Sequence, residues 1–231
     1  MDTLSAAWTL LLTADAELMG IIGLSLRVSL TATLIATLIG APIGAALAIW
    51  RFPGRRLVLL LASTLMALPP VVAGLFVYLA LSRAGPLGEL GLLFTPAAMI
   101  VAQSILILPI IIALVHAAIQ PMQREYDDML TSVAAGPWLR VRTLMWDARF
   151  VLVTAVLAGF GRAIAEVGAV LIVGGNIAGV TRVMTTTIAL ETSKGNLELA
   201  LALGLILMFI AFAVNVVMQG LTRFGRQYEV A

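Results

Sequence analysis

The chain has 231 residues, of which 61% are hydrophobic and 11% are charged, and its formal net charge is +2. Soluble domains carry about 25% charged residues, so this composition indicates an integral membrane protein. The chain has no cysteine and a single histidine, and Lys194 lies outside any Gly-Lys-Ser/Thr phosphate-binding loop, which excludes disulfides, thiolate or histidine-cluster metal sites and an ATP site of its own.

The apolar runs along the chain predict an all-α membrane protein with five transmembrane helices, since each run provides the roughly 20 residues needed to cross a bilayer. Residues 1–19 begin with acidic charges instead of the basic region of a signal peptide, so we expect an extracytoplasmic or interfacial segment. The transmembrane domain covers residues 20–221, and residues 222–231 form a tail. The five predicted spans are 20–50, 57–81, 95–119, 150–175 and 199–221.

The distribution of arginines predicts the orientation of these spans. The loop after the first span, the long loop 120–149 and the tail carry nine arginines, whereas the other loops hold Arg83, Arg182 and Lys194. Because basic residues accumulate in cytoplasmic loops, the N-terminus is expected outside and the C-terminus inside. Pro69-Pro70 and Pro109 are expected to kink the second and third spans, since proline removes a backbone hydrogen bond.

The loop 120–149 is the longest polar interruption in the chain. Four of its apolar residues share one helical face by their spacing: Tyr126, Met129, Leu130 and Val133. They predict a short amphipathic helix over residues 122–135, which Gly136-Pro137 ends, followed by a second helical piece from Trp138. Such a helix suits a groove on a partner protein. The alternative is an interfacial helix on the lipid surface, which the acidic residues at its start disfavour.

This loop resembles the cytoplasmic coupling loop of binding-protein-dependent ABC importer permeases. The family motif is Glu-Ala-Ala, three residues, then Gly. Gly136 matches the glycine, while Leu130, Thr131 and Ser132 occupy the Glu-Ala-Ala positions and the later proline of the family is absent. The resemblance implies that an ATPase docks here, on Tyr126, Met129, Leu130, Val133, Gly136, Pro137 and Trp138.

A second stretch is similar to the oxyanion branch of that family. It runs from Gly161-Arg162-Ala163-Ile164-Ala165-Glu166-Val167-Gly168-Ala169 through Gly174-Gly175-Asn176-Ile177 to Thr181-Arg182-Val183-Met184-Thr185-Thr186. The pattern resembles permeases for molybdate and tungstate, with the tungstate type closest. This resemblance implies the type I ABC importer permease fold and import of tungstate or molybdate.

The same resemblance implies partners. It predicts a homodimer in a prokaryotic inner membrane, two ATPase subunits on the cytoplasmic side and an extracytoplasmic oxyanion-binding protein. ATP and Mg would be bound by the ATPase, so this chain has no catalytic residue, cofactor or metal of its own and is not an enzyme. No nucleic-acid binding is expected. A self-sufficient secondary anion transporter or channel remains the alternative.

Two charges lie deep in the predicted fourth span. Arg162 and Glu166 stand four residues apart and therefore share one helical face. A charge at the bilayer centre costs at least about 2.5–3.5 kcal/mol, so the two are expected to pair. They either shape or gate the anion path or serve as a structural pair. The hydroxyls of Thr185 and Thr186 would either meet the entering anion or cap a helix.

Overall fold

The computed structural model describes residues 16–229, all of whose elements are helices, which confirms the all-α prediction. Residues 1–15 of the predicted outer segment and the last two residues of the tail lie outside the described residues. The elements in chain order are α2 (Ala16–Ile49), α3 (Arg55–Met66), α4 (Pro70–Leu81), the 3₁₀ turn η1 (Gly88–Leu90), α5 (Pro96–Ser132), α6 (Pro137–Asp147), α7 (Arg149–Ile164), α8 (Gly168–Gly174), α9 (Met184–Lys194) and α10 (Leu197–Glu229).

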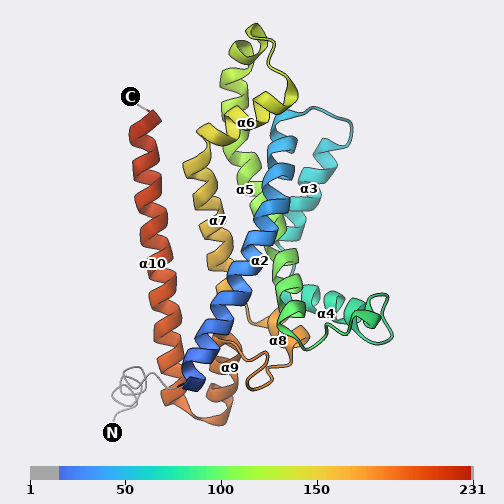
Figure 1. Ribbon diagram of the computed structural model, residues 1–231, viewed down its shortest axis with the longest axis vertical. Coiled ribbons are helices and arrows are strands. Elements are labelled where there is room, and N and C mark those ends of the chain that lie inside the picture. The colour runs from blue at the N-terminus through green and yellow to red at the C-terminus, as the bar shows by residue number, and fades with distance from the viewer. Residues whose placement is uncertain (1–15, 230–231) are drawn as a thin grey trace.

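The centre of the molecule is the pair of long helices α2 and α5, which cross at a slant in Figure 1. Small residues of α2, such as Ala32 and Ala45, pack on Ile107 and Ile111 of α5, and all four are buried. Gly44 brings the two backbones together, because a Cβ there would lie 2.7 Å from the carbonyl oxygen of Ile112. Small residues at such contacts let membrane helices approach closely.

Among the described residues, three helices, α2, α5 and α10, are long and apolar enough to cross a membrane alone. Two bent pairs, α3 with α4 at 103° and α6 with α7 at 73°, raise the number of candidate spans to at most five. The predicted kink at Pro69-Pro70 is in fact a full break, because Pro70 starts α4 as its first residue and Pro69 has extended backbone angles. A proline also disfavours helical geometry in the residue before it.

The predicted separate helix over residues 122–135 is wrong. Instead α5 continues through Pro109 and Pro121 to Ser132 without interruption, so the third span and the amphipathic segment form one helix of 37 residues. Just after the helix, Ala134 takes a left-handed φ of 48°, and the N–H of Ala135 donates to the carbonyl of Leu130 at 2.8 Å. A local backbone motif therefore ends the helix at Ser132, before the chain reaches Gly136.

The predicted fourth span, 150–175, consists of two helices. α7 ends at Ile164 and α8 begins at Gly168, so residues 165–167 form a break between them. α8 packs on α4, where a Cβ on Gly74 would lie 2.7 Å from the Cα of Ala169. Glu166 therefore lies in the break and not on the helix that carries Arg162.

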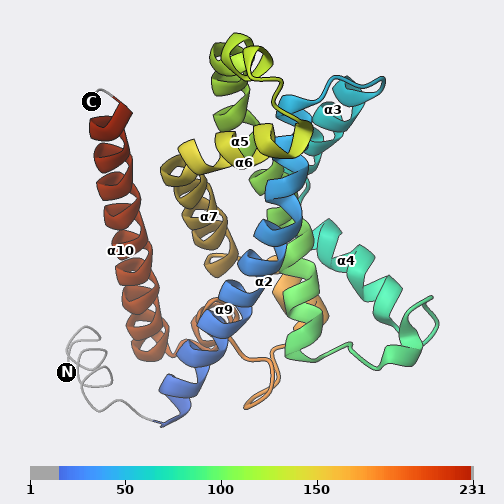
Figure 2. The ribbon, with the colours of Figure 1, turned by 45° about the horizontal axis from the view of Figure 1, so that its top comes forward.

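Different helices form the two ends of the molecule. α6, the C-terminal end of α5, the start of α3 and the C-terminal end of α10 gather at one end, and α4, α8 and α9 lie towards the other (Figure 1). In both views α10 stands at the side of the bundle, next to α7 and α9 (Figure 2). The basic loop after α2 and the basic α5–α6 region thus share one end, as the predicted orientation requires.

Candidate functional site

The turn between α5 and α6 is held by one arginine. Arg140 of α6 donates from Nη1 to Asp127 Oδ1 at 2.8 Å and from Nη2 to the hydroxyl of Thr131 at 2.9 Å, both on α5. Its Nε also donates to the carbonyl of Ala135 at 3.2 Å. Arg140 therefore fixes the angle at which α6 leaves α5. The sequence shows Arg140 only as one charge among several, and its role depends on these contacts.

The apolar residues expected to dock a partner divide into two groups. Leu130 is buried, and Tyr126 packs against the α2–α5 core cluster. Met129, Val133 and Trp138 are exposed, with 78% of Trp138 accessible. Gly136 precedes α6, which Pro137 begins as its first residue.

The exposed group extends along α6. Trp146, at the far end of this helix, is also exposed, and Arg149 lies over its ring at 5.1 Å. Leu144 is fully buried and anchors α6 to the α2–α5 core. We call Met129, Val133, Trp138 and Trp146 the elbow surface. These exposed apolar residues belong to the end of α5, the turn after it and α6.

The Arg162–Glu166 ion pair predicted from the sequence is present. Arg162 Nη1 donates to Glu166 Oε2 at 2.6 Å, and the side chain of Glu166 is 4% exposed whereas that of Arg162 is 39% exposed. The other carboxylate oxygen accepts the N–H of Ala169 at 3.2 Å, in the first turn of α8. Glu166 thus joins the end of α7 to the start of α8.

Both predicted threonines are buried and hydrogen-bonded. The hydroxyl of Thr185 donates to the carbonyl of Glu166 at 2.8 Å. The hydroxyl of Thr186 accepts the N–H of Val183 at 3.2 Å and lies 2.8 Å from Asn176 Oδ1. Thr185 therefore meets the break between α7 and α8, while Thr186 caps the start of α9 and ties it to the loop after α8.

Gln103 of α5 is a residue of this region that the sequence interpretation missed. Its Nε2 donates to the carbonyl of Ala163 at 3.0 Å, in the last turn of α7. The residue is 4% exposed. An amide within a long apolar run is the signal that could have identified it, because a buried polar group needs partners.

The C-terminal end of α9 carries a small charged cluster. Glu191 accepts hydrogen bonds from Lys194 Nζ at 2.9 Å and from Asn196 Nδ2 at 3.0 Å. The hydrogen bond from Lys194 holds the pKa of Glu191 below its ordinary value. Arg182 lies 3.5 Å from Glu17 at the start of α2. These contacts fix the α9–α10 turn and the start of α2.

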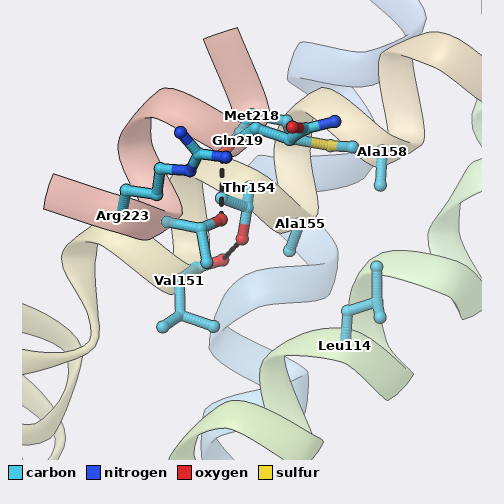
Figure 3. A pocket seen from close by; sticks show the side chains of 9 residues that line it. Leu114, Val151, Thr154, Ala155, Ala158, Met218, Gln219 and Arg223 are labelled. Atoms are coloured by element: carbon cyan, nitrogen blue, oxygen red, sulfur yellow. Dashed lines mark hydrogen bonds between the residues drawn. The ribbon is translucent and has the colours of Figure 1, made fainter. Parts of the chain in front are cut away.

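A cleft of about 470 Å³ opens between α5, α7 and α10 at the other end of the bundle (Figure 3). Its walls are mostly apolar, with Val151, Ala155 and Ala158 on α7, and Gln219 and Arg223 on α10. No residue singled out in the sequence lines it. The ion pair and the elbow surface are therefore separate from this cleft.

Comparison with known proteins gives clear relatives, although no family model matches the chain. The tungstate uptake system permease protein of Campylobacter jejuni is 41% identical over 96% of this chain and 93% of its own length. Its counterpart in Peptoclostridium acidaminophilum is 42% identical over 94% of this chain and 95% of its own length. Permeases named for molybdenum or sulfate transport also match, at 26–32% identity over shorter parts of the chain.

A solved structure shares the fold. A chain of a methionine ABC transporter in inward-facing conformations superposes with a TM-score of 0.68, covering 90% of this chain and 99% of the other. The two sequences are 17% identical, so this likeness concerns the fold alone. The likeness covers nearly all of the solved chain.

Proposed function

The chain belongs to the family of ABC-transporter anion permeases that includes the tungstate uptake permeases, and we propose that it moves tungstate into the cell. The likeness along nearly the whole chain is the observation that carries this proposal. The chain is the transport subunit, and ATP hydrolysis belongs to a separate ATPase subunit. Tungstate is favoured over molybdate and sulfate because the permeases named for those anions match less closely.

The elbow surface is the proposed contact with the ATPase. It presents Trp138 and Trp146 on a helix whose position Arg140 and Leu144 fix. Aromatic side chains dominate the energetics of protein interfaces. Movement of the ATPase would be transmitted through α6 to α5, which runs the length of the bundle, and through α7, which follows α6 after the single residue Ala148.

The proposed assembly is a homodimer of this chain with two ATPase subunits, which bind ATP and Mg, and an extracytoplasmic binding protein. In the proposed orientation the elbow surface is cytoplasmic and α9 lies at the outer side of a prokaryotic inner membrane. The gathering of the arginine-rich loops at one end of the molecule supports this orientation.

The break between α7 and α8 is the proposed gate region. Arg162 is the one member of the predicted group, Arg162, Glu166, Thr185 and Thr186, with a substantially exposed side chain. Its charge can attract an oxyanion, while Glu166 holds the guanidinium in place. Thr185 supports the break through its hydrogen bond to the carbonyl of Glu166, and Thr186 holds the start of α9 beside it.

ATP-dependent uptake tests the proposal. The permease is reconstituted with its ATPase and binding protein, and uptake of tungstate, molybdate and sulfate is compared by elemental analysis. Tungstate uptake at the lowest concentration is the expected result. Uptake of another anion with ATP would keep the mechanism and change the substrate, whereas uptake without ATP would support a self-sufficient secondary transporter.

A further inference from the structure

A small buried cavity lies where the α7–α8 break meets three other elements. Ser25 and Ser29 of α2, Gln103 of α5, Glu166 of the break and Thr185 of α9 line it. All five side chains belong to buried residues. Its volume is about 10 Å³, close to the roughly 10–15 Å³ that one water molecule needs.

Gln103 lines this cavity, and its amide oxygen is unpaired. Nε2 donates to the carbonyl of Ala163, but Oε1 is buried and has no hydrogen-bond partner in the protein. Exchanging the amide oxygen and nitrogen of Gln103 would not give the oxygen a partner, because the oxygen would then face the carbonyl oxygen of Ala163, which also only accepts. A buried acceptor left unpaired costs about 1–3 kcal/mol.

The other polar groups around the cavity also offer acceptors. Thr185 lines the cavity and its hydroxyl hydrogen already bonds the carbonyl of Glu166, so its oxygen can offer only lone pairs to a ligand. Ser25 donates to the carbonyl of Ile21 and already accepts the N–H of Met184. The carboxylate of Glu166 adds a negative charge. This arrangement favours a ligand that donates hydrogen bonds.

We propose that the cavity binds one ordered water, which donates to Gln103 Oε1 and to a second acceptor among Thr185 and Glu166. Non-helical backbone at membrane depth requires partners from neighbouring helices, Ser or Thr side chains or ordered water. The α7–α8 break already has partners from neighbouring helices and from a threonine side chain, through Gln103, Thr185 and Glu166. The water completes this set and joins α5 to α9 or to the break.

The water site also assigns a role to Gln103. Its amide contacts the end of α7 directly and the start of the break through the water. Gln103 is therefore a positioning residue for the break. The site is distinct from the exposed guanidinium of Arg162, so it does not depend on the proposed anion path.

X-ray hydroxyl-radical labelling of the assembled transporter tests this proposal, because radicals formed from a bound water oxidise the side chains beside it. Ile164 and Val183 line the cavity and are 4% and 5% exposed. We expect mass spectrometry to find them oxidised several-fold more than Ile21 and Val77, which are 6% and 5% exposed and do not line the cavity. Oxidation no higher than in these controls would overturn the proposal.

Two variants, and a comparison of sodium with choline, extend the test. Gln103→Met removes the amide acceptor with little change of side-chain volume. Thr185→Val removes the hydroxyl acceptor and keeps the shape of the side chain. Labelling of Ile164 and Val183 should fall in either variant that remains monodisperse, and unchanged labelling in both would contradict the water site. An unfolding temperature that rises with sodium relative to choline in the native chain, but not in Gln103→Met, would instead assign the cavity to a cation.

Discussion

At the scale of residues, Glu166 connects α7, α8 and α9. It pairs with Arg162 and accepts the N–H of Ala169, while the backbone carbonyl of Glu166 accepts the hydroxyl of Thr185. Removing one member of a buried pair leaves an uncompensated charge, whereas removing both does not. The structure thus supports a structural contribution of the pair whether or not Arg162 also meets the anion.

We therefore expect Arg162→Met to lower the free energy of unfolding by about 1–3 kcal/mol, less than for a fully buried pair because Arg162 is partly exposed. The double variant Arg162→Met/Glu166→Gln should recover part of this loss, since the introduced amide keeps an acceptor for the N–H of Ala169 without the charge. Thermal unfolding in detergent measures both. A double variant no more stable than Arg162→Met would show that the pair is not coupled in this way.

At the scale of elements, close contact between helix backbones sets the stability of the bundle. Gly44→Ala places a Cβ 2.7 Å from the carbonyl oxygen of Ile112 and forces α2 away from α5. Overpacking of this kind costs about 1–3 kcal/mol. Gly23→Ala is the matched control on the same helix, because nothing lies within 4 Å of its Cβ, and alanine favours the helix over glycine. Equal unfolding temperatures for the two variants would refute the packing role of Gly44.

The joint between α5 and α6 allows a second prediction at this scale. Arg140→Gln removes the hydrogen bonds to Asp127 and Thr131, so α6 should lose its fixed angle. We expect substrate-stimulated ATP hydrolysis to fall several-fold while the permease still purifies with its ATPase. Arg142→Gln is the control, since Arg142 lies exposed on the same helix. A similar loss in both variants would point to general surface charge and not to the joint.

At the scale of the whole molecule, the orientation in the membrane is open to a direct test, because the chain has no cysteine. Ser132 and Ser193 are both exposed, and each donates its hydroxyl to a carbonyl three residues earlier. In intact cells a membrane-impermeant thiol reagent should label Ser193→Cys and should reach Ser132→Cys only after permeabilisation. The reverse pattern would invert the proposed topology, and labelling of both in intact cells would refute a membrane between them.

The sequence by itself determined the class of the protein. Composition and hydropathy are properties of the local chain, so the helical membrane character and the long apolar runs could be predicted from them. The motif around Arg162 and Glu166 indicated the family, and their spacing predicted the ion pair that the structure contains. Helix ends were harder to predict. α5 runs through Pro121 and ends at Ser132, just before the left-handed Ala134 and not at Gly136.

Only the tertiary structure decided which groups meet. Gln103 and Ala163 are 60 residues apart in sequence, and Ser25 and Met184 are 159 apart, yet both pairs share hydrogen bonds at the same buried cavity. The break between α7 and α8 is stable because α5 and α9 supply partners to its backbone, which no local pattern encodes. A hydropathy profile records the cost of leaving water, residue by residue. The partners that offset the cost of a buried polar group are set by how the helices cross.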